Sequence, residues 1–213
     1  MVTQSFSTIF KSDLIVWNQV NKTLVCEIIN KNDLPNLLKV TEIILSENDY
    51  FEYQNGNNIN ILILSLYGTI RVNENNIISS RESFTIKSSD KGLIKINNEL
   101  SDEKADILIL EFRSVNPQDS ESKEDLIIHH KNTLKTISEM LDYPNHIGLF
   151  DGRKEHTYQL SNIENSIFGM VINGAFEFQN RLMETRDAII LHNPQTLEFE
   201  ALSENALILL FEI

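Results

Sequence analysis

Two stretches of the chain, "LILSLYGTIRVNENNIISSRESFTI" (62–86) and "GMVINGAFEFQNRLMETRDAII" (169–190), decide the fold class. In each stretch an apolar run leads to a glycine, an alternating segment, a polar turn and a further apolar run. Gly68 and Gly174 occupy equivalent places in this layout. Two copies of one layout in the same order predict a duplicated β domain.

The rest of the chain extends this pattern. Each half places an acidic residue, Glu82 or Asp187, directly before a strand, and each half closes on a similar apolar segment, 107–112 or 207–213. Short apolar or alternating runs separated by polar turns are typical of a sandwich or barrel rather than of alternating strands and helices. We therefore predict an all-β protein with two β domains within its 213 residues.

A polar segment separates the two halves. "SVNPQDSESKED" (114–125) has few apolar residues and carries a proline, which is typical of a linker or a long connection. We predict an N-terminal barrel over 1–113, a linker over 114–130 and a C-terminal barrel over 131–213.

Charge and cysteine content exclude several classes of function. The net charge of −13 opposes binding to nucleic acids and to anionic membranes. No apolar run is long enough to span a bilayer. Cys26 is the only cysteine and lies in an apolar run, so we expect a buried and unreactive thiol. The expected location is the cytoplasm, with no nucleic-acid or membrane partner.

The C-terminal part of the sequence resembles a known family. "DGR" (151–153), "GAFEFQNRL" (174–182) and "RDA" (186–188), within residues 146–213, resemble the C-terminal domain of pirin-like bicupins. The resemblance implies two tandem cupin-type jelly-roll β-barrels. The N-terminal half matches this family in its order of strands only.

The same resemblance implies a metal centre that this sequence does not support. Metal-binding members hold a divalent cation in the first barrel with three histidines and a glutamate, a set that suits Fe, Mn, Ni or Zn. A gapless placement puts these positions at Gln54, Gly56, Lys95 and Asn97, and residues 1–128 contain no histidine. A lysine at such a position also repels a cation. No metal and no other cofactor is therefore predicted.

The placement nevertheless indicates a pocket at the mouth of the first barrel. Its candidate residues are Glu52, Gln54, Tyr67, Lys95 and Asn97. We predict no catalytic residue from the sequence, because it contains no intact catalytic motif.

A less favoured metal site involves the second barrel. His156 and His192 would approach each other if their strands were neighbours, and Glu155 or Glu198 would complete the ligands. The simpler interpretation is that both histidines lie at surface or strand-end positions.

The favoured function is a catalytically silent pirin-like bicupin that binds an unknown small molecule or protein without a metal centre. One alternative is a metal-dependent dioxygenase of the pirin or quercetinase type. Another is a metal-free cupin isomerase that uses Lys95 as a base after burial lowers its pKa. Dimerisation through exposed edge strands stays open.

Overall fold

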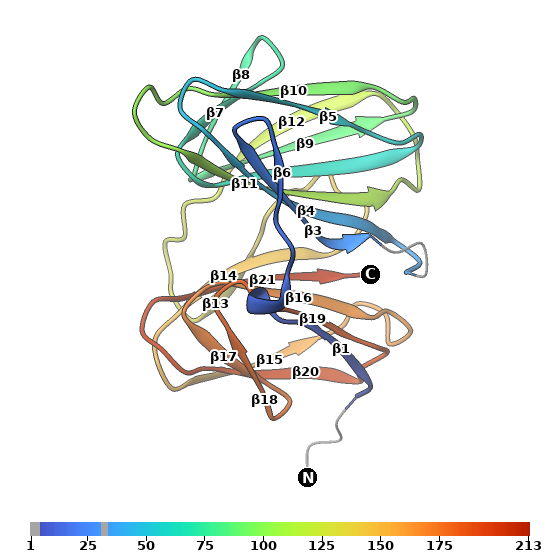
Figure 1. Ribbon diagram of the computed structural model, residues 1–213. Helices are drawn as coiled ribbons and strands as arrows, with labels where there is room; N and C mark the ends of the chain where they lie inside the picture. The colour runs from blue at the N-terminus through green and yellow to red at the C-terminus, as the bar shows by residue number, and fades with distance from the viewer. Residues whose placement is uncertain (1–4, 31–33) are drawn as a thin grey trace. The chain divides into compact units, whose positions relative to one another are not determined.

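The protein is described by a computed structural model that covers residues 5–30 and 34–213. Among these residues the only helical element is a short 3-10 turn, η1 (Ser12–Leu14). The chain forms two compact units (Figure 1). The C-terminal unit contains the chain up to Leu14, Ile128–Ile137 and Tyr143–Ile213, and the N-terminal unit contains Ile15–Ile127 and Ser138–Asp142.

The N-terminal unit consists of two sheets. Its strands are β2 (Asn18–Val20), β3 (Thr23–Asn30), β4 (Leu37–Leu45), β5 (Tyr50–Gln54), β6 (Ile59–Tyr67), β7 (Thr69–Val72), β8 (Asn76–Ser79), β9 (Glu82–Ser88), β10 (Leu93–Asn98), β11 (Ala105–Arg113) and β12 (Ser120–Asp125). The larger sheet has the order β12-β9-β6-β11-β4-β3-β2, and the smaller sheet has the order β5-β10-β7-β8.

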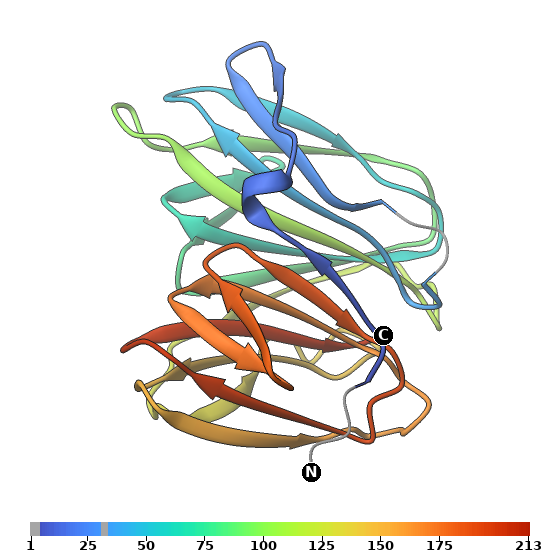
Figure 2. The same ribbon diagram turned by 60° about the horizontal axis from the view of Figure 1, so that its bottom comes forward.

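The C-terminal unit repeats this plan (Figures 1 and 2). Its strands are β1 (Ser7–Phe10), β13 (Thr133–Thr136), β14 (Asn145–Phe150), β15 (Lys154–Gln159), β16 (Ile167–Asn173), β17 (Ala175–Phe178), β18 (Arg181–Glu184), β19 (Ala188–Leu191), β20 (Thr196–Ala201) and β21 (Ala206–Glu212). The larger sheet has the order β1-β19-β16-β21-β14-β13, and the smaller sheet has the order β15-β20-β17-β18.

The two sheets of each unit enclose an apolar core, as expected of a cupin-type barrel. β20 alternates between buried and exposed residues, so one face packs and the other meets water. β6 and β16 are almost continuously apolar because both of their faces are buried. The Cys26 side chain is fully buried, and burial raises the pKa of its thiol to about 12, as the apolar run predicted. No helix among the described residues is long and apolar enough to cross a membrane.

The predicted duplication is confirmed at the turn glycines. Gly68 and Gly174 have φ angles of 88° and 83°. A Cβ atom at either position would lie 3.2 Å or less from the Cβ atom of the alanine that begins β11 or β21, Ala105 or Ala206. Only glycine combines this left-handed backbone with such a close approach.

The two acidic residues of the repeat also have matching roles. Glu82 and Asp187 each accept a hydrogen bond of 2.9 Å from the backbone N–H three residues earlier. Each also pairs with a lysine on or next to the edge strand of its sheet. Lys123 on β12 lies 3.1 Å from Glu82, and Lys11 after β1 lies 2.5 Å from Asp187.

The structure divides the chain differently from the predicted 1–113, 114–130 and 131–213. Residues 5–14 belong to the C-terminal unit, where β1 pairs with β19. The predicted linker contains β12, which pairs with β9 of the N-terminal unit. Residues 138–142 belong to the N-terminal unit, since Asp142 accepts hydrogen bonds from Asn60 and Lys87. Local composition does not reveal these pairings because they join residues far apart in the sequence.

Replacing Asp187 by alanine is expected to weaken the attachment of β1 to the edge of its sheet, where it pairs with β19. The Asp187 carboxylate is 1% exposed and accepts hydrogen bonds from Lys11 Nζ and from the Ser12 N–H, at 2.5 and 2.9 Å. Its loss should destabilise this attachment by about 2 kcal/mol and speed tryptic cleavage after Lys11, measured by mass spectrometry. Glu184→Gln is the matched control, because it changes an exposed side chain at the end of β18 and keeps the backbone N–H that bonds to Asp187. Equal cleavage of the two variants would contradict this role.

Candidate functional site

The predicted pocket residues on β5 and β10 face away from the barrel interior. Glu52 and Lys95 are directly opposite each other in the strand register, and both are exposed. The inward positions are occupied by the alternate residues Tyr53, Ile94 and Ile96. The predicted placement inside the barrel mouth is therefore wrong. Because side chains alternate along a strand, an error of one residue moves a whole set to the other face.

The five candidates do not meet at one site. Lys95 and Asn97 line a hollow of about 420 Å³ on the outer face of the small sheet, whereas exposed Gln54 and Glu52 do not line it. Tyr67 is 53% exposed, and its hydroxyl donates a hydrogen bond to the carboxylate of Glu103, which is not one of the candidates. Lys95 lies 4.5 Å from the centroid of an exposed tyrosine ring rather than in a closed barrel. The burial that the lysine-base hypothesis requires is absent.

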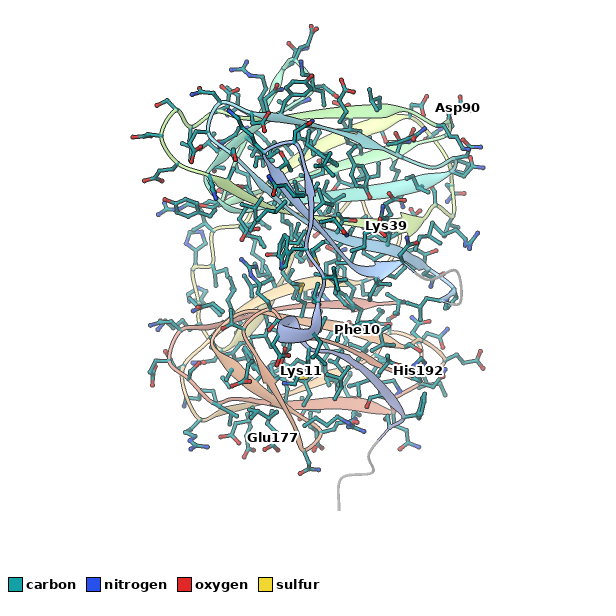
Figure 3. The ribbon with its side chains drawn as sticks, viewed as in Figure 1. Phe10, Lys11, Lys39, Asp90, Glu177 and His192 are labelled. Atoms are coloured by element: carbon teal, nitrogen blue, oxygen red, sulfur yellow. The ribbon has the colours of Figure 1, made fainter. Side chains whose placement is uncertain are left out.

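The two histidines of the alternative metal site lie in different sheets. His156 is on β15, next to β20, whereas His192 follows β19 and lies within 3.5 Å of Thr8 (Figure 3 marks His192). His156 does share a hollow of about 330 Å³ with Glu155 and Glu198, and burial lowers the pKa of its imidazole. Within the described residues, however, no group of three or more His, Cys, Asp or Glu could hold a metal ion.

Polar side chains instead gather at one end of the N-terminal barrel, from its interior to solvent. We call Glu27, Lys39, Thr41, Tyr53 and Glu111 the inner polar set (Figure 3 marks Lys39). Strand pairing places Glu111 directly opposite Lys39 and Thr41 directly opposite Glu27. Tyr53 reaches the same place from the smaller sheet, where it belongs to the core.

The alternation of the strands explains why this set faces inward. On β11 every second residue, Ile107 and Ile109, enters the core, and Glu111 is the next in this series. On β4 the core residue Ile43 is preceded at the same spacing by Thr41. The apolar pattern therefore continues into polar residues at one end of the barrel.

Contacts link the members of the set. The Tyr53 hydroxyl donates a hydrogen bond to Glu111 Oε1. Lys39 Nζ lies 2.6 Å from Glu27 Oε1 and 5.5 Å from the centroid of the Tyr53 ring. Glu111 is 8% exposed, whereas the Lys39 and Glu27 side chains are 26% and 42% exposed. The set thus runs from a buried carboxyl group to solvent.

Burial perturbs the two innermost groups. It raises the pKa of the Glu111 carboxyl group, and the Tyr53 hydrogen bond and the Lys39 charge oppose this rise. Burial and the neighbouring Glu111 raise the pKa of Tyr53, which the Thr41 hydroxyl opposes. Thr41 is 1% exposed, and its Oγ1 makes no hydrogen bond of regular geometry within the described residues. The site therefore holds a proton-binding carboxyl group beside polar atoms with spare bonding capacity.

The C-terminal barrel contains a counterpart of this arrangement. Glu212 lies six residues after Ala206, the first residue of β21, just as Glu111 lies six residues after Ala105, the first residue of β11. Tyr158 donates a hydrogen bond of 2.7 Å to Glu212 Oε1. His146 Nε2 lies 3.1 Å from the Tyr158 hydroxyl. Glu212 also accepts hydrogen bonds of 2.7 Å from the Ser161 N–H, the Ser161 hydroxyl and Asn165 Nδ2.

The two carboxyl groups differ in how fully they are bonded. Glu212 accepts four hydrogen bonds, and together these lower its pKa although burial alone raises it. In the described part of the chain Glu111 accepts a hydrogen bond only from Tyr53. Glu212 is therefore a structural anchor, whereas Glu111 keeps acceptor capacity. The Tyr53–Glu111 and Tyr158–Glu212 pairs were not predicted from the sequence. Two signals were visible: the shared "YQ" at 53–54 and 158–159, and a glutamate near the end of each of the similar apolar segments.

Comparison with known proteins agrees with this architecture. Residues 142–213 match the family model described as the quercetinase C-terminal cupin domain. No curated protein sequence matches the chain. The bacterial pirin YhhW from Escherichia coli, solved in complex with nickel(II), is 12% identical, with a TM-score of 0.83 over 98% of this chain and 99% of that chain.

In fold, the chain is a pirin-like bicupin. Two further structures support this assignment. GK1651 from Geobacillus kaustophilus is 11% identical to the bicupin, with a TM-score of 0.74 over 100% of this chain and 97% of that chain. Quercetin 2,3-dioxygenase from Acinetobacter baumannii is 11% identical, with a TM-score of 0.73 over 97% of this chain and 78% of that chain.

The residues of this bicupin do not fit the metal centre that the pirin-like resemblance implies. The inward positions of β5 and β10 carry Tyr53, Ile94 and Ile96, of which the two isoleucines have no donor atom. Residues 1–128 contain no histidine. The Lys39 ammonium group at the polar end of the barrel would repel a divalent cation.

Proposed function

We propose that this pirin-like bicupin binds a small molecule at the inner polar set of its N-terminal barrel, without a metal centre. In this role the protein does not catalyse the metal-dependent dioxygenase reaction. The observation that carries the proposal is Glu111, a buried carboxyl group with spare acceptor capacity inside a barrel that lacks imidazole ligands. Beside Glu111, the buried Thr41 Oγ1 has no hydrogen bond of regular geometry within the described residues. Buried polar groups are normally hydrogen-bonded, and exceptions often mark a site.

The internal duplication supports this choice of site. At the matching place in the C-terminal barrel, Glu212 has its hydrogen bonds completed by the chain itself. The fold can therefore satisfy such a carboxylate with its own donors, and among the residues that the structure describes it does so fully only for Glu212. A ligand with donor groups would complete the bonding of Glu111 in the other barrel.

Metal content is the first test of this function. We expect protein purified without a histidine tag or chelator to carry less than about a tenth of an equivalent of any transition metal, since the ligand set is missing. Elemental analysis by mass spectrometry measures this directly. Near one equivalent of Fe, Mn, Ni or Zn would overturn the proposal and return attention to the dioxygenase alternative.

A further inference from the structure

The inner polar set combines a base with a positive charge. Glu111 and Lys39 are directly opposite each other on neighbouring strands, and the Tyr53 hydroxyl bonds to Glu111. A carboxylate held beside an ammonium group and a phenol can remove a proton next to a carbonyl group. The carboxylate takes the proton, and the cation stabilises the negative charge that forms on oxygen.

We propose that Glu111 is the base of a metal-free site that enolises small 2-hydroxy- or 2-keto-carbonyl compounds. This inference rests on the proposed function, because it assigns a substrate class and a chemistry to the same site. It assigns the role of base to a buried carboxyl group rather than to Lys95, which the structure places on the outer surface.

The reaction balances without an oxidant or a reductant. Glu111 accepts the proton from the carbon next to the carbonyl, and the electrons of that C–H bond form a C=C bond. The carbonyl π electrons move to oxygen, giving an enolate that the Lys39 ammonium group stabilises. Glu111 then returns the proton to the same carbon, which restores the starting compound. In a 2-hydroxy compound the proton of the 2-hydroxyl group of the enediolate moves to the former carbonyl oxygen, and Glu111 returns its proton to the former carbonyl carbon, so that the carbonyl and hydroxyl groups exchange places. The first outcome is exchange with solvent hydrogen, and the second is isomerisation.

Several observations agree with this assignment. Burial shifts the pKa of Glu111 upward, which increases its strength as a base toward a carbon acid. The Thr41 hydroxyl has a buried oxygen without a regular hydrogen bond and can contact a substrate oxygen. Lys39 and Glu27 are partly exposed, so the set is open to solvent at that end.

The test is solvent deuterium exchange, followed by proton NMR in D₂O. The probes are dihydroxyacetone and pyruvate, which lose C–H signal when they are enolised. We expect the wild-type protein to accelerate this loss for at least one probe by about 100-fold or more over buffer, and Glu111→Gln to remove most of that acceleration. Glu52→Gln is the matched control, because Glu52 is exposed on the outer face of β5 beside Tyr53.

The outcomes separate this inference from the proposed function. No acceleration with either probe, or full activity of Glu111→Gln, would overturn the inference even when the protein is metal-free. Activity lost with EDTA and restored by a metal would overturn the proposed function as well. If Glu111→Gln does not fold, Tyr53→Phe replaces it, and a reduced exchange rate in that folded variant is the supporting result.

Discussion

Replacing Glu212 by alanine is expected to lower the free energy of unfolding of the C-terminal unit by about 3–4 kcal/mol. The Glu212 carboxylate is 1% exposed and accepts hydrogen bonds from Tyr158, Asn165 and both donors of Ser161. Truncation leaves these donors unsatisfied and loosens the connection at 160–165 from the last strand. Thermal unfolding should show a decrease in melting temperature on the order of 10 °C.

A matched variant and a pH series sharpen this expectation. Tyr158→Phe removes one of the four donors and should cost about 1.5 kcal/mol. The folded state lowers the pKa of Glu212, so its contribution is fully present above the unfolded value of about 4.3. That contribution is lost as the pH falls through the lower, folded-state pKa. A difference between wild type and Glu212→Ala that persists unchanged in strong acid would contradict this account.

Replacing Gly174 by alanine is expected to destabilise the same unit by about 3 kcal/mol. Gly174 has a φ of 83°, and an added Cβ would lie 2.3 Å from Ser203 Oγ and 3.1 Å from the Ala206 Cα. Ser203 cannot move without cost, because its hydroxyl accepts a hydrogen bond from the Ala175 N–H at 3.0 Å. The free-energy cost of the backbone strain and that of the close contact therefore add.

Gly56→Ala is the control for this substitution. A Cβ at Gly56 would meet no atom closer than 3.7 Å, from the Ile59 side chain, so its effect should stay within about 1 kcal/mol. Chemical denaturation of both variants with separate probes for the two units measures the difference. Equal stability of the Gly174 and Gly56 variants would show that the turn does not need glycine.

Much of the architecture could be predicted from the sequence because its causes are local. The alternation of apolar residues identifies strands, and the spacing around Gly68 and Gly174 identifies the repeated turn. The acidic residues Glu82 and Asp187 also have the equivalent positions that the repeat predicted. The absence of histidine from residues 1–128 was likewise decided by composition alone.

The candidate site could not be predicted in the same way. The inner polar set joins β3, β4, β5 and β11, which are brought together only by strand pairing and by the packing of two sheets. Whether Tyr53 or its neighbours Glu52 and Gln54 face inward depends on the register of β5 in the smaller sheet. A pattern of period two defines two faces but does not say which one meets the core when both carry polar residues.

The sequence by itself therefore determined an all-β, duplicated chain without the histidines of a first-barrel metal centre. Only the tertiary structure decided that β1 completes the C-terminal sheet and that Glu111 rather than Lys95 lies inside the first barrel. The physical reason is the separation along the sequence of the residues that interact. Turn geometry and alternation act between neighbours in the chain, whereas burial, pKa shifts and the meeting of charges depend on pairings between distant residues.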